Sequence, residues 1–526
     1  MMKMRARNVH YQIGDRTLLN IPEIKIHEGE RIGLVGRNGA GKSLLLQYLT
    51  GELDVKPQVD WHTTYGLMKQ LNDSEWDSSM LSGGEKTLVK LELLFKEGHS
   101  LLFLDEPTNN LDWSHIEELE RKLLLHKGAY LIVSHDRKLL NRCCNKIWEL
   151  EEGELNEYHG DYHFYEAQKA LKLKQQYEKH EQYVKEKKRI EARIRQKQAQ
   201  SKGMRKPPKR MGNSEWQLGK NKAAAQQKKV ERVGKTLERR LERLEKQDKP
   251  MEWDQVKMEF AHVHPSHQKT IGVINDSVIK AGEKFLFRSP KLFLKTGSKT
   301  ALIGENGTGK STFIQHLLNT GEWAARGVRI GYFHQALEDL PQQKNVYDFV
   351  SDGSDMSETT IRIILARLRF SADEMNKTLS QLSGGERVKL SLAKLIASGA
   401  SLLVMDEPTN HLDLDAIQAL ESLVRDFPGT ILYVTHDRTF IERTADQLWM
   451  IEKRELKPFN GTWIQWEEYS VHSPEADEEM YDRMALETRL SELISRLSMP
   501  GPKDCVEDLE TEYNETLTKL KKMRNE

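Results

Sequence analysis

The stretch that decides the fold reads Gly36-Arg37-Asn38-Gly39-Ala40-Gly41-Lys42-Ser43, and it returns as Gly304-Glu305-Asn306-Gly307-Thr308-Gly309-Lys310-Ser311. Both copies fit the phosphate-binding pattern G-x-x-x-x-G-K-[ST]. Each follows a short apolar run and precedes an apolar segment, so the loop is expected to join a strand to a helix N-terminus. Glycines let backbone N–H groups approach a phosphate, and the helix N-terminus favours the anion. The loops therefore predict two nucleotide sites.

The last two side chains of each loop carry the polar chemistry of these sites. Lys42 and Lys310 are expected to reach the β- and γ-phosphates of ATP, and the hydroxyls of Ser43 and Ser311 to bind Mg²⁺. One such match can arise by chance, but two in equivalent contexts argue against chance. The other loop residues expected to contact the nucleotide are Gly36, Asn38, Gly39, Gly41, Gly304, Asn306, Gly307 and Gly309.

Each half also contains an apolar run that ends in two acids. The runs read Leu-Leu-Phe-Leu-Asp-Glu at 101–106 and Leu-Leu-Val-Met-Asp-Glu at 402–407. A continuous apolar run is typical of a parallel strand covered on both faces. Asp105 and Asp406 are suited to the Mg²⁺ shell, and Glu106 and Glu407 to orienting and polarising the attacking water. A solvated acid pair at a strand end is the alternative.

A third motif, Ser-Gly-Gly, comes directly before a predicted helix at 82–84 and again at 383–385. Such a triplet offers a second anion site at a helix N-terminus. With the loops above, it resembles the signature of the ABC ATPase family, in which the signature of one cassette completes the ATP site of the other. The resemblance implies composite sites that pair Lys42 with Ser383 and Lys310 with Ser82. It assigns the signature contacts to Ser82, Gly83, Gly84, Ser383, Gly384 and Gly385.

The spacing of these motifs is the same in the two halves. Ser82 and Asp105 are 23 positions apart, as are Ser383 and Asp406; Glu106 and His135 are 29 apart, as are Glu407 and His436. The resemblance identifies His135 and His436 as switch histidines that contact the γ-phosphate. A lone histidine would more often be structural, but the equal offsets favour the functional interpretation.

Two further contacts follow from the family pattern. Gln70 and Gln335 resemble the glutamines that contact the metal, although their flanking residues differ, so an ordinary surface glutamine is the alternative. Tyr11, 25 positions before Gly36, resembles an adenine-stacking aromatic. The same offset in the second half gives Ile279, which leaves Phe285 or Phe287 as the second adenine contact.

Composition excludes several classes of protein. No apolar run approaches the ~18 residues of a membrane span, and no hydrophobic segment follows Met1–Arg5 as in a secretory signal. Three cysteines, Cys143, Cys144 and Cys505, have no metal-type spacing. We therefore expect a reduced, cytoplasmic protein without membrane contact. A chain of 526 residues predicts several domains.

The stretch between the two halves carries a charge that the neutral total hides. Residues 171–250 contain 26 Lys and Arg against 10 Asp and Glu, whereas the rest of the chain has 54 against 70. The composition is helical, with a break at Pro207-Pro208 and Gly212 and a second helix from about Ala223. A basic helical hairpin favours a polyphosphate partner such as RNA. A solvated coiled coil rich in lysine is the alternative.

The hairpin tip, about 203–220, mixes cations with apolar side chains. Exposed Met and Trp side chains are suited to stacking on bases or filling a crevice. Local packing that closes the hairpin is the alternative for Trp216. The residues expected to contact a partner are Lys206, Lys209, Arg210, Met211, Asn213, Ser214, Trp216 and Leu218.

Two features distinguish the two halves: the length of a helical subdomain and a C-terminal extension. Gln70 and Ser82 are 12 positions apart, whereas Gln335 and Ser383 are 48 apart, so the first cassette lacks most of a helical subdomain that the second keeps around Glu358–Phe370. After residue 472, leucines recur at helical spacing around Pro500-Gly501-Pro502, which predicts a C-terminal helical hairpin.

Taken over the whole chain, this organisation resembles the ABC-F family of ribosome-associated ATPases. The expected fold is α/β: two tandem ABC-type P-loop ATPase domains, 1–160 and 251–472, joined by a helical hairpin, 161–250, and followed by a helical extension, 473–526. The Asp-Glu-Pro-Thr-Asn-x-Leu-Asp form at 105–112 and 406–413 strengthens the resemblance, although Asn110 stands where the family usually has His.

The resemblance implies a function and partners. The chain would act as a monomer whose two cassettes pair, with ATP and Mg²⁺ as cofactors, and would bind the bacterial 70S ribosome rather than DNA. Its hairpin would enter the E site, contact 23S rRNA and P-site tRNA, and displace streptogramin A, lincosamide and pleuromutilin antibiotics. The trimmed first cassette and long linker resemble the antibiotic-resistance branch. A housekeeping translation factor is the first rival; a DNA-repair ATPase fails because its coil would interrupt a cassette.

Overall fold

The computed structural model describes residues 1–14, 16–53, 58–69, 83–109, 111–203, 213–244, 269–321, 323–325, 327–333, 341, 343–410, 412–471, 513 and 517. The chain divides into two compact units, one of Met1–Asn110, His115–Lys257 and Asp413–Asp415, the other of Leu111–Ser114, Met258–Leu412 and Ala416–Glu526. Several predicted contacts lie outside the described residues: Gln70, Ser82, Gln335, Lys206, Lys209, Arg210, Met211 and almost all of the extension 473–526.

The first unit is built on a six-stranded sheet, β5-β6-β7-β3-β8-β9, in which only β8 and β9 are antiparallel. A three-stranded antiparallel sheet of β2-β1-β4 packs into the same core. The strands are β1 (Met2–Ile13), β2 (Arg16–His27), β3 (Arg31–Val35), β4 (Gln58–Trp61), β5 (Tyr65–Met68), β6 (Leu101–Asp105), β7 (Ala129–Val133), β8 (Lys146–Glu151) and β9 (Glu154–His159). The helices are α1 (Lys42–Thr50), α2 (Gly83–Lys96), α3 (Trp113–Leu125) and α4 (Arg137–Cys143).

Burial explains why the central strands read as continuous apolar runs. Every residue of β6 and β7 is buried, because helices or the second sheet cover both faces. Leu101, Phe103, Leu131 and Trp148 are completely buried in one cluster with residues of α1 and β1. The parallel strands bring the loop after β3 and the acids after β6 to the same edge of the sheet.

The second unit repeats this plan in an eight-stranded sheet, β11-β12-β19-β18-β14-β17-β16-β15, with a separate pair β10-β13. Its strands are β10 (Thr270–Ile274), β11 (Ser277–Ala281), β12 (Lys284–Ser289), β13 (Leu292–Lys295), β14 (Lys299–Gly304), β15 (Ile330–Phe333), β16 (Leu402–Asp406), β17 (Thr430–Val434), β18 (Gln447–Glu452) and β19 (Glu455–Phe459). Its helices are α7 (Lys310–Thr320), α8 (Val346–Ser351), α9 (Glu358–Arg367), α10 (Gly384–Ala397), α11 (Leu414–Asp426), α12 (Arg438–Thr444) and α13 (Trp463–Val471), with 3₁₀ turns at Glu374–Asn376 and Leu379–Gln381. The prediction of two tandem ABC-type cassettes is confirmed.

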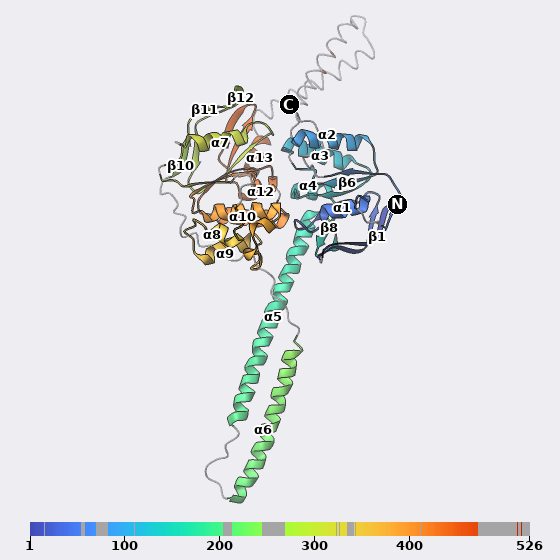
Figure 1. Ribbon diagram of the computed structural model, residues 1–526, viewed down its shortest axis with the longest axis vertical. Coiled ribbons are helices and arrows are strands. Elements are labelled where there is room, and N and C mark those ends of the chain that lie inside the picture. The colour runs from blue at the N-terminus through green and yellow to red at the C-terminus, as the bar shows by residue number, and fades with distance from the viewer. Residues whose placement is uncertain are drawn as a thin grey trace. The chain divides into compact units, whose positions relative to one another are not determined.

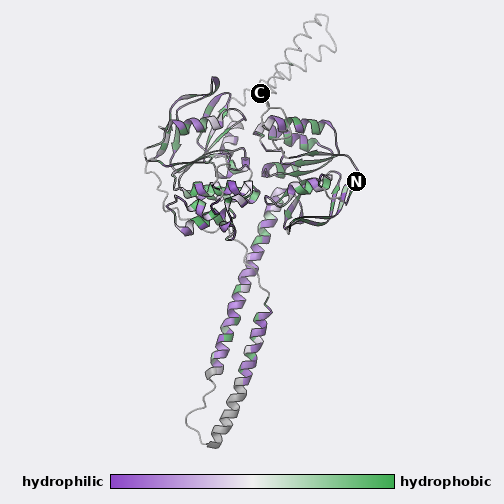
Figure 2. Cartoon of the chain, viewed as in Figure 1, coloured by the Kyte–Doolittle hydropathy of each residue, from purple (hydrophilic) through white to green (hydrophobic). Residues whose placement is uncertain are grey.

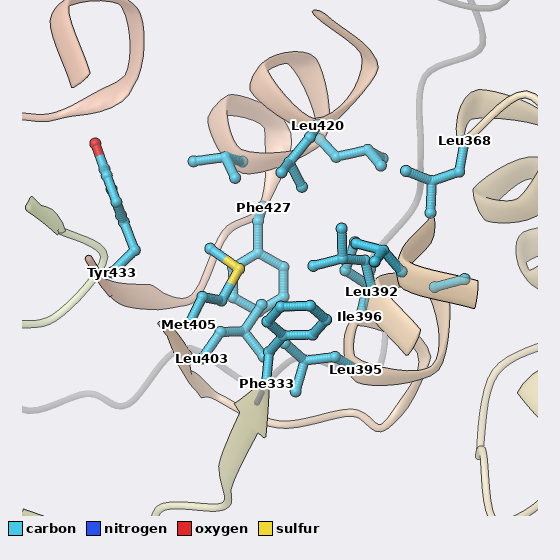
Figure 3. Packing of buried hydrophobic residues seen from close by; sticks show 14 of the residues in the cluster. Phe333, Leu368, Leu392, Leu395, Ile396, Leu403, Met405, Leu420, Phe427 and Tyr433 are labelled. Atoms are coloured by element: carbon cyan, nitrogen blue, oxygen red, sulfur yellow. The ribbon is translucent and has the colours of Figure 1, made fainter. Parts of the chain in front are cut away.

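The helices that the second cassette keeps form one core with its sheet. Figure 3 shows Leu392, Leu395 and Ile396 of α10 facing Phe333 of β15 and Leu403 of β16. Leu368, just after α9, belongs to the same buried cluster. Helices α8, α9 and α10 are therefore an integral layer of this cassette rather than an appendage.

Two long helices follow the first cassette. Helix α5 spans Tyr162–Gly203 and α6 spans Asn213–Glu242, and they run side by side (Figure 1). Their facing side chains are joined by hydrogen bonds from Ser201 to Glu231 and from Arg240 to Glu186. The described part of α5 is predominantly hydrophilic along its length (Figure 2), and only Ile190 and Ile194, one turn apart, are buried beyond its root.

The hairpin differs from the prediction in one respect. The sequence predicts an irregular tip up to about residue 220 and a second helix from about Ala223, but α6 already begins at Asn213. Asn and Ser at 213 and 214 are favoured at helix starts, and the lone Gly219 costs a helix only about 1 kcal/mol. Asn213, Ser214, Trp216 and Leu218 therefore lie on the first turns of a helix.

No helix within the described ranges is long and apolar enough to cross a membrane.

Candidate functional site

Each phosphate-binding loop connects a buried strand to a helix, as its sequence predicts. Gly41 and Gly309 are the residues directly before α1 and α7, with φ angles of 101° and 105°. Side chains rarely adopt this left-handed conformation, so glycine is required there. Because the capping residue of each helix is a glycine, no side chain of that residue caps the N-terminus of α1 or α7. The first backbone N–H groups of α1 and α7 are thus available to an anion.

The loop lysines turn back into the loops that carry them. Lys42 Nζ donates to the carbonyl oxygens of Gly36 and Arg37 at 2.8 and 3.2 Å, and Lys310 Nζ to those of Gly304 and Glu305 at 2.8 and 2.9 Å. Burial lowers the pKa of both lysines. A desolvated ammonium beside a helix N-terminus gains strongly from a phosphate, so the phosphate contact of these lysines stays a prediction with a physical basis.

The aspartates at the strand ends fit the predicted metal sites. Asp105 and Asp406 are 6% and 9% exposed, and one carboxylate oxygen of each is buried without a hydrogen-bond partner among the described residues. Burial raises the pKa of Asp105, and a hydrogen bond with Ser43 opposes this. A buried, unsatisfied carboxylate oxygen next to a serine hydroxyl is the hard oxygen donor set that Mg²⁺ prefers.

The residue directly after each of these strands, the predicted catalytic glutamate, has an unusual backbone. Glu106 and Glu407 both have φ of 49°, and their N–H groups donate to the carbonyl oxygens of Val133 and Val434 at 2.9 Å. A left-handed non-glycine residue costs on the order of 1 kcal/mol or more and often marks a functional site. The strain turns each glutamate away from the strand direction, toward the histidine after the neighbouring strand.

Each glutamate faces the predicted switch histidine. His135 Nε2 lies 3.2 Å from Glu106 Oε1, and His436 Nε2 lies 3.4 Å from Glu407 Oε1. Burial raises the pKa of Glu106 to about 8 and that of Glu407 to about 7. Burial, followed by the nearby loop lysine, lowers the pKa of each histidine to about 3. Both histidines are therefore neutral and can donate one ring hydrogen bond while accepting another.

The signature serine of the second half has a defined local role. Ser383 caps α10: its hydroxyl accepts from the Glu386 N–H at 3.4 Å, and the Glu386 carboxylate accepts from the Ser383 N–H at 2.7 Å. Gly384 and Gly385 form the first turn of α10, as Gly83 and Gly84 do in α2. The serine hydroxyl is thus fixed at a helix N-terminus, where an anion is favoured.

The aromatic side chains predicted to contact adenine differ in how exposed they are. Tyr11 lies in β1, half-buried against the core of the first unit. In the second unit Phe287 is fully buried, with its ring 5.7 Å from that of Phe313. Phe285 is 40% exposed on the same strand. Of the two alternatives, only Phe285 is accessible to a base.

The sequence did not predict a pair of hydroxyl groups close in the chain to each glutamate and histidine. The Thr409 and Thr435 hydroxyls lie 2.6 Å apart, and those of Thr108 and Ser134 lie 3.4 Å apart. Thr435 and Ser134 also accept from the N–H groups of Asp437 and Asp136 at 3.2 and 3.0 Å. These bonds tie the turn after the glutamate to the turn that contains the histidine. The repeated Pro-Thr and Ser/Thr-His-Asp sequences were the available signal.

Comparison with known proteins agrees with this geometry. The model of the family described as ABC transporter matches residues 19–64 and 287–410. The ribosome protection protein VmlR of Bacillus subtilis is 31% identical over 549 residues, covering 98% of this chain and 97% of that protein. The erythromycin resistance ATP-binding protein MsrA of Staphylococcus epidermidis is 30% identical over 480 residues, covering 85% and 97%.

Solved structures support the fold alone. The RNase-L inhibitor has a TM-score of 0.58 at 17% identity, covering 90% of this chain and 92% of its own. An archaeal ribosome recycling factor, aABCE1, in complex with the stalk protein aP1, has a TM-score of 0.57 at 17% identity, covering 86% and 89%. Both therefore resemble this chain in architecture over most of its length.

Proposed function

Because the chain belongs to the ABC-F family of ATPases, we propose that it binds the bacterial 70S ribosome and protects it against antibiotics. The observation that carries this proposal is the similarity of nearly the whole chain, its long basic helix included, to a protein named for ribosome protection. The chain is an ATP hydrolase. The proposal concerns what that hydrolysis drives.

In the proposed cycle the described residues have separate roles at each nucleotide site. The loop N–H groups and Lys42 or Lys310 bind the phosphates. Glu106 or Glu407, in its ionised form, would orient the attacking water and take its proton, and the neutral His135 or His436 would donate to the γ-phosphate. Ser43 with Asp105, and Ser311 with Asp406, would hold Mg²⁺, which supplies positive charge at the phosphates when bound.

The two cassettes are proposed to pair within one molecule. Ser383, Gly384 and Gly385 would then complete the site of Lys42, and the signature at 82–84 the site of Lys310. The support is the N-terminus of α10, which Ser383 caps. A helix N-terminus of this kind favours an anion, and the phosphate loop of the same cassette lies at a different helix, so a phosphate bound by the other cassette is the proposed anion. ATP would draw the cassettes together, and hydrolysis would release them.

The hairpin is proposed to deliver the effect at the ribosome. Exposed cations lie along α5, among them Lys172, Lys174, Lys179, Lys187, Lys188, Arg193 and Arg195. Such a helix is suited to rRNA and tRNA backbones, where each phosphate contact releases counterions. Entry at the E site would place residues 203–220 toward the peptidyl transferase centre. P-site tRNA would move, and a bound streptogramin A, lincosamide or pleuromutilin would be released.

Expression in a drug-sensitive bacterium tests the proposal. Minimum inhibitory concentrations of the three drug classes should rise with the wild-type gene. They should not rise with a gene lacking residues 204–212, although the purified variant keeps its ATPase activity. Ribosome binding without any change in drug susceptibility would reject resistance and favour a housekeeping translation factor.

A further inference from the structure

The root of the hairpin holds a buried charged side chain that the ATP sites do not use. Glu149, in the middle of β8, is only 3% exposed and lies between the buried Trp148 and Leu150. Its carboxylate interacts with three donors: the Tyr158 hydroxyl at 3.1 Å, the Tyr165 hydroxyl at 2.7 Å and Lys169 Nζ at 2.8 Å. Tyr165 and Lys169 lie on the first two turns of α5. We call Glu149, Tyr158, Tyr165 and Lys169 the root network.

The root network keeps its carboxylate ionised in spite of burial. Burial alone would raise the pKa of Glu149, but Lys169 and the hydrogen bonds outweigh it and leave the pKa below its ordinary value. Lys169 Nζ also donates to the Tyr165 hydroxyl at 3.1 Å. A buried charge is tolerated only when it is paired and hydrogen-bonded in this way, so the network demands one arrangement of β8, β9 and α5.

The second cassette has no ionic or phenolic side chain at the positions equivalent to the root network: three are apolar, and Ser470 stands in place of Lys169. Glu149 and Met450 both pair in register with the residue just before the phosphate loop, Val35 and Ile303 respectively. At equal offsets along the chain from Met450, Phe459 stands in place of Tyr158 and Trp466 in place of Tyr165. The same site in the fold is thus ionic in the first cassette, where α5 begins, and has Met450 in place of the carboxylate in the second.

The network also adjoins the phosphate loop. A methyl group on Gly36 would lie 2.5 Å from the carbonyl oxygen of Leu150, the residue after Glu149. The start of the loop and β8 are therefore in contact with no space between them. A backbone shift at Gly36 has to displace β8, and the carboxylate that holds α5 moves with it.

We propose that Glu149 is a positioning residue that sets the direction of the hairpin relative to the first cassette and links it to the nucleotide loop. Leverage is the physical reason. Helix α5 has 42 residues and so is about 63 Å long, and a tilt of about 10° at its root displaces the far end by ~11 Å. Apolar packing tolerates sliding, whereas three directional bonds to one carboxylate fix both tilt and rotation.

A variant pair separates this role from a merely structural one. Glu149→Met alone removes the acceptor of both tyrosine hydroxyls and one of two carboxylates near Lys169, whose Nζ also lies 3.8 Å from Asp415, and is expected to destabilise the cassette. Glu149→Met with Lys169→Met removes the buried carboxylate together with its cation, and replacing such a pair by apolar residues is often neutral for stability. Asp415, the other acid near Lys169, keeps Arg37 at 3.5 Å. Glu157→Gln, on the neighbouring β9, is the control for the removal of a surface charge. The double variant is therefore the informative one.

The readout is the distance between spin labels on cysteines placed at Glu154 and Lys188, both exposed, in a Cys505→Ser background. Cys143 and Cys144 are buried, and burial raises the pKa of the Cys143 thiol to about 12, so both label poorly. The wild type and Glu157→Gln should give a narrow distribution that shifts when non-hydrolysable ATP is added. The double variant should give one at least twofold wider, with no shift, at unchanged melting temperature and ATPase rate within twofold.

A narrow, nucleotide-sensitive distribution in the double variant would overturn the proposal. The measurement needs no ribosome, so it stands apart from the proposed function, on which only the consequence for ribosome binding rests. If the distribution widens and ribosome co-sedimentation falls, both hold. If it widens while co-sedimentation is unchanged, Glu149 positions the hairpin as proposed, and the hairpin's role in ribosome binding is rejected.

Discussion

The signature helices of the two cassettes begin with the same Ser-Gly-Gly-Glu motif and then meet different surroundings. In α10, Leu390 is completely buried and Lys394 donates to backbone carbonyls of Phe349 and Asp352 beside α8. At the equivalent positions of α2, Val89 is 37% and Leu93 is 50% exposed. The nucleotide chemistry is thus duplicated, while the outer layer that covers it is not.

The other end of each cassette differs in the opposite sense. The first continues into α5, of 42 residues, through the carboxylate of Glu149, whereas the second has Met450 at that position. The first cassette therefore combines a partly exposed signature helix with a long helix that follows its last strand. The comparison teaches that the two nucleotide sites can be alike in geometry while the structure around them differs.

The largest expected effect tests whether the two sites are catalytically equal. Glu106→Gln with Glu407→Gln should still bind ATP but reduce hydrolysis by about 10²–10⁴-fold, because an amide cannot accept the water's proton. The measurement is phosphate release beside nucleotide binding. Each single variant compares the sites: equal geometry predicts equal losses. Robust turnover by the double variant would remove these glutamates from the mechanism.

The next effect concerns the unequal cover. Leu390→Ala should cost about 2–5 kcal/mol of unfolding free energy, because it leaves a cavity under α8 and α9. Val89→Ala, its counterpart in α2, should stay within about 0.5 kcal/mol, as exposed substitutions do. Urea unfolding of the full chain measures both. Equal losses would mean that α2 is covered as well as α10.

A smaller effect tests the outward half of the comparison. Replacing Lys187, Lys188, Arg193 and Arg195 by Gln should reduce the slope of log affinity for ribosomes against log salt by up to ~0.7–0.9 for each phosphate that the hairpin no longer neutralises. The matched control replaces Lys280, Lys284, Lys291 and Lys457, four exposed lysines of the second cassette. If the control flattens the slope as much, the phosphate-binding cations are not concentrated on the hairpin.

The smallest effect lies at the start of α6. Trp216→Ala should change the pattern of minimum inhibitory concentrations across the three drug classes more than Gln217→Ala, because an indole fills space that alanine leaves empty. The two residues are adjacent, so their position in the helix is closely matched. ATPase rates should be unaffected by either. Identical drug profiles would assign Trp216 to the packing of the hairpin.

Much of the fold was accessible from the sequence because its constraints are local. A phosphate loop needs glycines at fixed offsets, and a buried parallel strand needs an apolar run, so both cassettes and the ends of β6 and β16 could be predicted. The start of α6 differs from the predicted one by ten residues, Asn213 against Ala223. Pro207-Pro208 and Gly212 disfavour a helix only up to residue 212, whereas Asn213-Ser214 favour a helix start.

The sequence by itself determined the two nucleotide loops, their acids and histidines, and a basic hairpin between the cassettes. Only the tertiary structure decided which side chains are buried and which meet. Phe287 is buried while Phe285 is exposed, and the Glu149 carboxylate contacts Tyr165 and Lys169 at the root of α5. The reason is physical. A motif is fixed by the shape of a phosphate and the repeat of a strand or helix, whereas burial and pairing depend on residues that are distant in sequence and adjacent only after folding.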